Sequence, residues 1–240
     1  MGGGGALGAA HVGVLQVLHE RGIHPSMVAG TSAGSVIGAA YAAGYDPYWM
    51  EDLVVSSTWG TFGTLTFSPG LGVLDTAGLR ASVDAVANAD ALIEDMPIPY
   101  AAVATDVRTL EPVIINSGPV VDAMCASIAV PGLFRPTQAQ GHLLVDGGVV
   151  QNLPLQAVLD MGAEHVIGVR LAAEWDVGGP IPSTALAIHE LEIDRRVTLI
   201  APHLGRRSQW VAKDLPGLIR LGREAAERAL GDYEVVASRP

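Results

Sequence analysis

The chain has 240 residues, of which 49% are hydrophobic and 16% are charged, and its formal net charge at pH 7 is −11. These values are typical of one large α/β domain with a buried core, and they exclude a disordered chain. The acidic balance disfavours nucleic acid as a partner.

The charge is unevenly spread along the chain. Residues 1–194 contain 5 basic and 20 acidic side chains, whereas residues 195–240 contain 9 basic and 5 acidic ones. The basic C-terminal part has three interpretations: it packs on the acidic body, it contacts an anionic membrane surface, or it presents a solvated helical face. The single cysteine, Cys125, and the lack of a secretory signal predict a cytoplasmic protein, peripheral to a membrane under the second interpretation.

Predicted strands and helices alternate along the chain. The expected helices cover residues 9–21, 35–43, 79–91, 119–126, 155–161 and 215–230, and the expected strands cover residues 27–29, 99–105, 112–115, 143–146 and 165–171. This alternation predicts an α/β fold with a mostly parallel central sheet flanked by helices. Residues 49–74 interleave aromatic side chains with Gly, Ser and Thr, which predicts either a flap over the site or an irregular packed region. A loop or linker is expected at residues 178–182.

A serine lies between two glycines at a strand-to-helix junction. In the stretch Gly30-Thr31-Ser32-Ala33-Gly34, an apolar strand precedes the turn and a helix of small residues follows it. This context is the one that a nucleophile elbow requires, because the turn leaves no room for large neighbours and the helix N-terminus favours developing negative charge. With 29 glycines in the chain, a plain glycine-rich turn remains the alternative.

The best candidate for a base is a carboxylate. Asp146 ends an apolar strand and precedes Gly147-Gly148, which predicts a position at the carboxyl edge of the sheet; a turn aspartate is the alternative. None of the seven histidines stands where a Ser–Asp–His order would place it, unless His189 or His203 folds back. No cluster of side chains has the spacing of a metal site, so we expect no metal.

The glycine-rich N-terminus fits two kinds of site. Gly3 to Gly8 matches the dinucleotide pattern G-x-G-x-x-G, but only Met1-Gly2 precedes it and Glu20 falls inside a predicted helix. A dinucleotide site needs a strand before the loop and an acidic residue after it, so nucleotide binding is disfavoured. A run of amides with little side-chain cover can instead stabilise an oxyanion.

Together these motifs resemble the patatin-like phospholipase family. The matching stretches are GGGGALGAAHVGVL at the start, GTSAGS at the elbow, ASIAVPGLFRP at residues 126–136 and VDGGVVQNLP at residues 145–154, with a weaker match at PIPYAAVATD. The resemblance covers residues 2–172 and implies a three-layer α/β/α fold. It divides the chain into a catalytic core, 1–172, and a C-terminal extension, 173–240, with a basic amphipathic helix on the same domain.

The resemblance also implies a chemistry. Members of the family hydrolyse acyl esters of glycerolipids, and often small esters, through a Ser–Asp dyad without an organic cofactor or metal. Carried over, Ser32 is the nucleophile, Asp146 is the base, and the oxyanion donors are Gly3, Gly4, Gly5 and Ala33. The remaining motif positions are Gly8, Gly30, Gly34, Gly147 and Gly148.

Two departures from the family pattern bear on activity. Leu7 replaces the usual Arg or Lys, which favours neutral esters over phosphate headgroups. Met1 begins almost in the glycine loop, where the family usually has a hydrophobic strand first, so the sheet lacks a strand, borrows one, or the sequence starts late. The main alternative to a lipid or ester hydrolase is therefore a catalytically weak or inactive patatin-fold protein with a binding or regulatory role.

Overall fold

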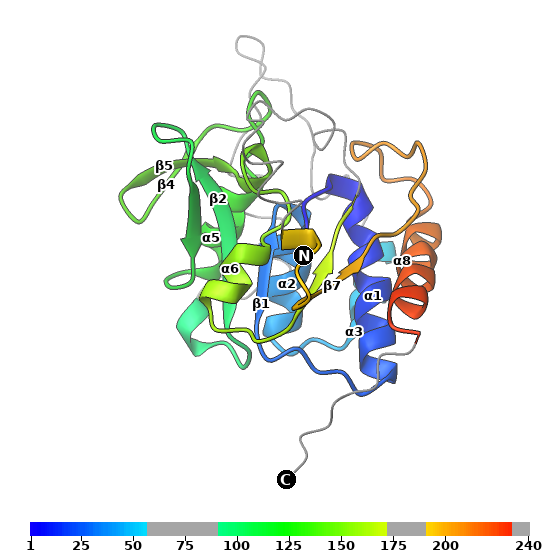
Figure 1. Ribbon diagram of the computed structural model, residues 1–240. Helices are drawn as coiled ribbons and strands as arrows, with labels where there is room; N and C mark the ends of the chain where they lie inside the picture. The colour runs from blue at the N-terminus through cyan, green and yellow to red at the C-terminus, as the bar shows by residue number, and fades with distance from the viewer. Residues whose placement is uncertain (57–90, 172–190, 232–240) are drawn as a thin grey trace.

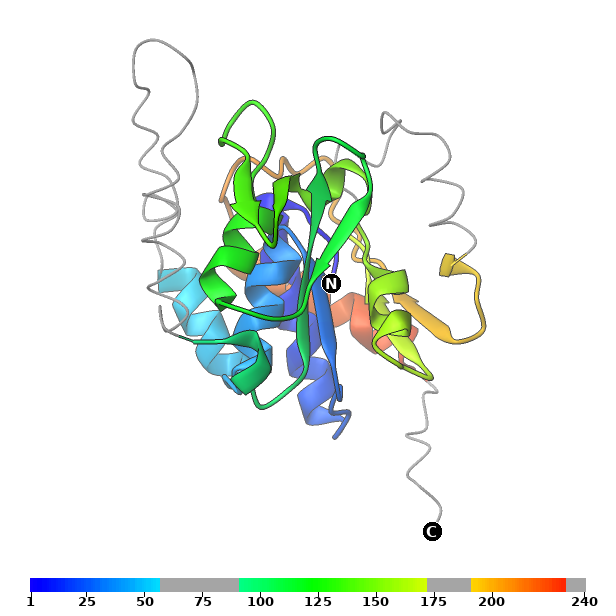
Figure 2. The same ribbon diagram turned by 90° about the vertical axis from the view of Figure 1, so that its left-hand side faces the viewer.

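The computed structural model describes residues 1–56, 91–171 and 191–231. The segment expected to be a flap (apart from residues 49–56), the helix expected at residues 79–91 (apart from residue 91) and the loop expected at residues 178–182 lie outside these ranges. Figure 2 views the main sheet nearly edge-on, with α2 (Ala33–Ala42) and α5 (Val120–Ser127) on one side and α6 (Leu155–Asp160) on the other. The predicted three-layer α/β/α architecture is confirmed.

The main sheet is mixed rather than mostly parallel. Its five strands are β1 (Val28–Thr31), β2 (Tyr100–Asp106), β3 (Pro112–Ile115), β4 (Thr137–Ala139) and β5 (His142–Asp146). β1 pairs with β2 in parallel, whereas β3 and β5 pair with β2, and β4 with β5, in antiparallel orientation. For β2–β3 and β4–β5 the reason is the short connection, because a short turn between consecutive strands makes them antiparallel neighbours.

The pairing brings the ends of two strands together. β3 occupies one edge of β2, so β1 and β5 share the other edge. β1 ends with Thr31 opposite Val103, and β5, which runs the other way, ends with Asp146 opposite Ala104. Since Val103 and Ala104 are consecutive, the two strands meet head to head, and the residues that follow them converge at one point.

A second, smaller sheet joins the first through the N-terminus. β6 (Val166–Val169) pairs in parallel with β7 (Val197–Ile200). The Gly2 N–H donates to the Val169 carbonyl at 2.9 Å, and the Met1 carbonyl accepts from Thr31 N–H at 3.1 Å. Met1 and Gly2 therefore lie between β1 and β6. This is the place of the hydrophobic strand that family members usually have before the glycine loop.

The basic C-terminal helix packs on the body of the protein. α8 (Leu215–Ala229) crosses α1 (Ala9–Glu20), as Figure 1 shows at the right of the molecule. The crossing is close because Gly13 and Gly222 face the opposite backbone; a Cβ at Gly222 would collide with the carbonyl of Ala10. Arg223 also pairs with Glu20 at 2.8 Å. For α8, the structure therefore agrees with the first of the three interpretations of the basic C-terminal part, which is packing on the acidic body.

The predicted helices and strands of the described ranges are present, with ends that differ by at most two residues from those expected. The remaining elements are α3 (Pro47–Ser56) and the short 3₁₀ turns at Gly5–Gly8, Ile93–Asp95 and Gly147–Val149. In the described ranges, we find no helix with the length and apolar character needed to cross a bilayer. The division of the chain at residue 172 stays a prediction.

Candidate active site

Ser32 occupies a strained turn between β1 and α2. Its backbone has φ +52° and ψ −124°, a left-handed region that costs a non-glycine residue on the order of 1–3 kcal/mol. The turn fits only because its neighbours lack side chains: a Cβ at Gly30 would collide with the carbonyl of Gly34, and one at Gly34 with the carbonyls of Met1 and Gly2. The strained conformation, the preceding strand and the following helix are the features of the predicted elbow.

Two further serines hold this turn in place. The Ser32 N–H donates to Ser127 Oγ at 2.9 Å, and the buried Ser127 hydroxyl donates to the Val103 carbonyl at 2.7 Å. The Ser35 hydroxyl donates to the Ser32 carbonyl at 2.7 Å. Ser127 therefore links the elbow to β2. Sequence reasoning gave it no role, although it lies in the stretch at residues 126–136 that carries the family resemblance.

Asp146 is fixed at the end of β5 and is only 6% exposed. Its N–H donates to the Ala129 carbonyl at 2.9 Å, and its Oδ1 accepts from Gly148 N–H at 2.7 Å. Gly147 lies so close to β2 that a Cβ there would collide with the Val103 carbonyl. The predicted glycine pair thus lets the chain turn sharply and lets a backbone amide orient the carboxylate.

The electrostatics of Asp146 suit a base. Burial raises the pKa of its carboxyl from 3.8 to about 6, and hydrogen bonding from the Gly148 amide and the Ser32 hydroxyl opposes this rise. The pKa therefore lies closer to neutral pH than that of an exposed aspartate, which makes the carboxylate a stronger base while leaving it mostly ionised at pH 7.

The amides of the glycine loop divide into two groups. The Gly3 N–H donates to the Asn152 carbonyl at 3.0 Å, so it is already engaged. The N–H groups of Gly4 and Gly5 have no acceptor within the described ranges, and both residues line the same cavity as Ser32. Ala33 is the first residue of α2, where helix N–H groups have no partner within the helix. Gly4, Gly5 and Ala33 thus leave three amides near the serine.

A small cavity lies between these groups. Its volume of about 30 Å³ is enough to admit a water molecule. The lining residues are Gly4, Gly5, Ser32, Val130, Asp146, Gly148, Val149, Asn152, Gln209 and Trp210. Asn152 belongs to the stretch at residues 145–154, but sequence reasoning gave it no role. Sequence reasoning also missed Gln209 and Trp210, because both belong to the basic C-terminal part, where no motif marks them.

The glycine loop is anchored from two sides. The Ala6 N–H donates to the Gln209 carbonyl at 2.9 Å. On the other side, Nε2 of the fully buried His11 lies 2.7 Å from the Gly2 carbonyl, and burial lowers the pKa of His11 to about 3. The imidazole is therefore neutral and donates its Nε2 proton. Leu7 lies in the 3₁₀ turn Gly5–Gly8 and is buried in the apolar core rather than at the cavity. Its side chain therefore contributes to packing and gives no support for a preference for neutral esters over phosphate headgroups.

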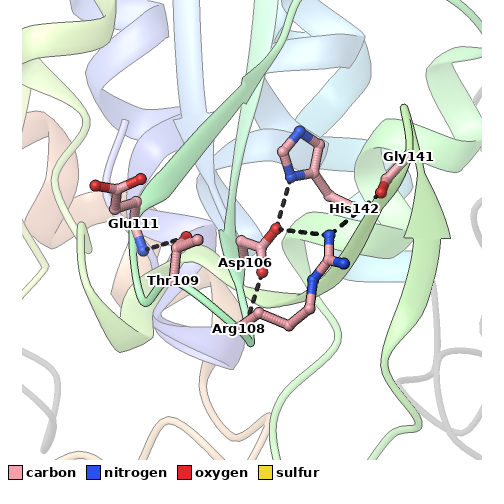
Figure 3. Close-up of polar contacts among 6 residues, drawn as sticks. All are labelled: Asp106, Arg108, Thr109, Glu111, Gly141 and His142. Atoms are coloured by element: carbon pink, nitrogen blue, oxygen red, sulfur yellow. Dashed lines mark hydrogen bonds and ion pairs between the residues drawn. The ribbon is translucent and has the colours of Figure 1, made fainter.

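The described histidines do not reach this cavity. The clearest His–Asp pair is His142 with Asp106, whose Nδ1 and Oδ2 atoms are 2.6 Å apart. Figure 3 shows His142 and Arg108 both pointing at the Asp106 carboxylate, which joins the β2–β3 turn to the β4–β5 hairpin. The bond from His142 lowers the pKa of Asp106 to about 2. This pair therefore stabilises two turns, and the cavity holds a serine and a carboxylate without an imidazole from the described residues.

Comparison with known proteins identifies related chains. The family model described as patatin-like phospholipase matches residues 1–159. An uncharacterized NTE family protein of Mycobacterium tuberculosis is 38% identical over 176 residues, covering 71% of this chain and 48% of the relative. The human patatin-like phospholipase domain-containing protein 6 is 33% identical over 189 residues, covering 72% of this chain and 13% of the relative. The chain thus spans about half the length of the mycobacterial relative and a small part of the human one.

Two solved structures share the fold. The crystal structure of VipD from Legionella pneumophila superposes with a TM-score of 0.64 at 15% identity, covering 96% of this chain and 66% of that one. The type III effector protein ExoU gives a TM-score of 0.50 at 17% identity, covering 98% of this chain and 53% of that one. At such identities the likeness concerns the fold.

Proposed function

Because the chain belongs to the patatin-like phospholipase family, we propose that it hydrolyses carboxylic esters of lipids or of short acyl chains through Ser32 and Asp146. The observation that carries the proposal is the head-to-head meeting of β1 and β5. It sets the Ser32 hydroxyl against the Asp146 carboxylate in a cavity that Gly4 and Gly5 also line.

The proposed reaction has two halves. In the first, Ser32 Oγ attacks the ester carbonyl carbon while its proton passes to the Asp146 carboxylate. The oxyanion of the tetrahedral intermediate accepts hydrogen bonds from the amides of Gly4, Gly5 and Ala33. The intermediate then expels the alcohol, which takes the proton from Asp146, and leaves an acyl-serine. In the second half, Asp146 takes a proton from water, the resulting nucleophile attacks the acyl-serine, and the acid leaves as Ser32 regains its proton.

The contributions of the groups differ in size. A carboxylate of pKa about 6 is still a weak base for an alcohol, so general base catalysis supplies only part of the acceleration. An oxyanion donor is typically worth about 3 kcal/mol, which makes the amides near Ser32 the larger contribution. The hydrogen bonds that anchor Gly2, Gly3 and Ala6 support an oxyanion loop that is formed before substrate binds, and they weigh against the inactive alternative.

The proposal is tested by hydrolysis of p-nitrophenyl esters from acetate to palmitate. Ser32→Ala and Asp146→Asn are each expected to lower kcat/KM by at least a thousandfold on every ester that the parent cleaves. Asp160→Asn is the matched control, because Asp160 is an exposed carboxylate at the end of α6, and its kcat/KM should equal that of the parent. A folded Ser32→Ala protein that keeps its activity would overturn the proposal.

A further inference from the structure

The segment of residues 201–214 lies against the glycine loop. Figure 1 shows it above α8 and beside the start of α1. Its contact with the loop is the hydrogen bond from Ala6 N–H to the Gln209 carbonyl, and Gln209 itself is buried. Leu204, near the start of the segment, belongs to the apolar core. The segment is thus fixed to the body at both of these residues, so its outward-facing side chains have a defined place beside the candidate active site.

The outer face of the segment combines apolar and basic side chains. Trp210 is 50% exposed and Val211 is 55% exposed, and both count among the most exposed large apolar residues of the described ranges. Arg206, Arg207 and Lys213 are exposed around them. Within the segment, Asp214 is the one acidic residue, and it lies 3.7 Å from Arg207 and accepts a hydrogen bond from Gly217 N–H at the start of α8. The segment is therefore locally cationic on a chain whose net charge is −11.

Trp210 joins this outer face to the cavity. It lines the cavity together with Ser32 and Asp146, while half of its surface faces solvent. A tryptophan in this position offers an apolar ring and a polar N–H, the combination that favours the boundary between acyl chains and headgroups. Arginine and lysine side chains nearby attract anionic headgroups.

We infer that residues 205–213 dock on an anionic phospholipid bilayer, with Trp210 and Val211 entering the headgroup boundary. The inference rests on the proposed function, because it places the mouth of the Ser32 cavity against the source of a lipid ester. The acidic remainder of the chain is repelled by the same surface, which turns the basic segment, and with it the cavity, toward the membrane. A nucleic acid partner does not fit, because three cations on an otherwise acidic body give too small a basic surface.

The test uses the Ser32→Ala protein, so that binding is measured without hydrolysis. Co-sedimentation is compared for phosphatidylcholine vesicles and for vesicles with 30% phosphatidylglycerol, at low ionic strength. One cation near an anionic surface is worth a factor of about five in partitioning, so adding Arg206→Gln and Lys213→Gln together should weaken binding to the anionic vesicles about thirtyfold. Adding Trp210→Ala should weaken it on the order of tenfold through lost apolar contact.

Matched controls lie elsewhere on the surface. Arg220→Gln removes an exposed cation on α8, and Trp49→Ala removes a tryptophan on α3 that is 46% exposed. Both should bind the anionic vesicles within twofold of the Ser32→Ala protein. Equal losses in the controls and in the segment variants would overturn the inference, as would equal binding to neutral and anionic vesicles.

The outcomes separate docking from catalysis. If the otherwise native protein cleaves p-nitrophenyl butyrate but the Ser32→Ala protein does not bind anionic vesicles, the docking inference is wrong and the proposed function stands. If vesicles are bound with the expected dependence on Arg206 and Lys213, but no ester is cleaved, the proposed function is wrong and the docking surface stands. Arg206→Gln with Lys213→Gln in the native background should leave kcat/KM for p-nitrophenyl butyrate unchanged.

Discussion

Replacing Asp146 with asparagine should make the protein more stable at alkaline pH while removing its activity. The side chain is 6% exposed, and burial raises the pKa of its carboxyl from 3.8 to about 6. Asparagine keeps an oxygen that can accept from Gly148 N–H but carries no charge. The variant therefore removes the cost of ionising a buried carboxyl and leaves the turn at Gly147-Gly148 intact.

The size of the effect follows from the two pKa values. Because the folded pKa is the higher one, the folded state binds the proton more tightly than the unfolded state does. The stability due to this group is fully present below pH 4 and is lost as the pH rises through about 6. The full loss is about 3 kcal/mol, and roughly 1.5 kcal/mol of it falls between pH 5 and pH 8.

Urea unfolding of the parent and of Asp146→Asn at pH 5 and pH 8 measures this difference. The stability advantage of the variant should grow by roughly 1.5 kcal/mol from the lower to the higher pH. Asp160→Asn, the exposed carboxylate control, should show no such growth. An advantage for Asp146→Asn that is the same at both pH values, or a variant that is less stable than the parent at pH 8, would refute the burial argument.

Three other substitutions test separate parts of the account. Ser127→Ala leaves the Ser32 N–H without its acceptor, so the free energy of unfolding should fall by about 1–3 kcal/mol and kcat should fall more than KM changes; unchanged unfolding and kcat would refute the role of this bond. Gly222→Ala places a Cβ against the carbonyl of Ala10, so urea unfolding should show a loss of at least 1–3 kcal/mol, and a neutral result would mean that α1 and α8 separate readily. Asp106→Asn weakens the contacts from His142 and Arg108 that hold the two turns and should lower Tm at pH 7 without changing kcat/KM for a short ester; a lost activity would tie this pair to the site.

The local parts of the site could be predicted from sequence. Ser32 and its turn are set by five consecutive residues, and Asp146 is marked by an apolar strand before it and two glycines after it. The position of one relative to the other is not local, because it depends on β1 and β5 sharing one edge of β2. Alternating helices and strands favour a parallel sheet. The observed sheet is mixed because β3 and β5 pair with β2, and β4 with β5, in antiparallel orientation, and the β2–β5 pairing joins strands that are far apart in the sequence.

Contacts across long stretches of chain were beyond sequence reasoning. Gln209 meets Ala6 across about two hundred residues, and nothing in the composition of residues 201–214 indicates that contact. The engaged amide of Gly3 is a similar case, because its acceptor, the Asn152 carbonyl, is a backbone atom that no residue type marks. Short motifs indicate the chemistry of single residues. Which amides of the glycine loop lack an acceptor, and which side chains line the Ser32 cavity, depends on how distant segments pack.

The most direct test of the central claim is the rate at which a fluorophosphonate labels Ser32 as a function of pH. If Asp146 is the base, the labelling rate should rise with pH through a midpoint of about 6, because only the ionised carboxylate accepts the serine proton. The rate should be low at every pH in Asp146→Asn and absent in Ser32→Ala. Labelling of Ser32 at the parent rate in Asp146→Asn would contradict the Ser–Asp pair.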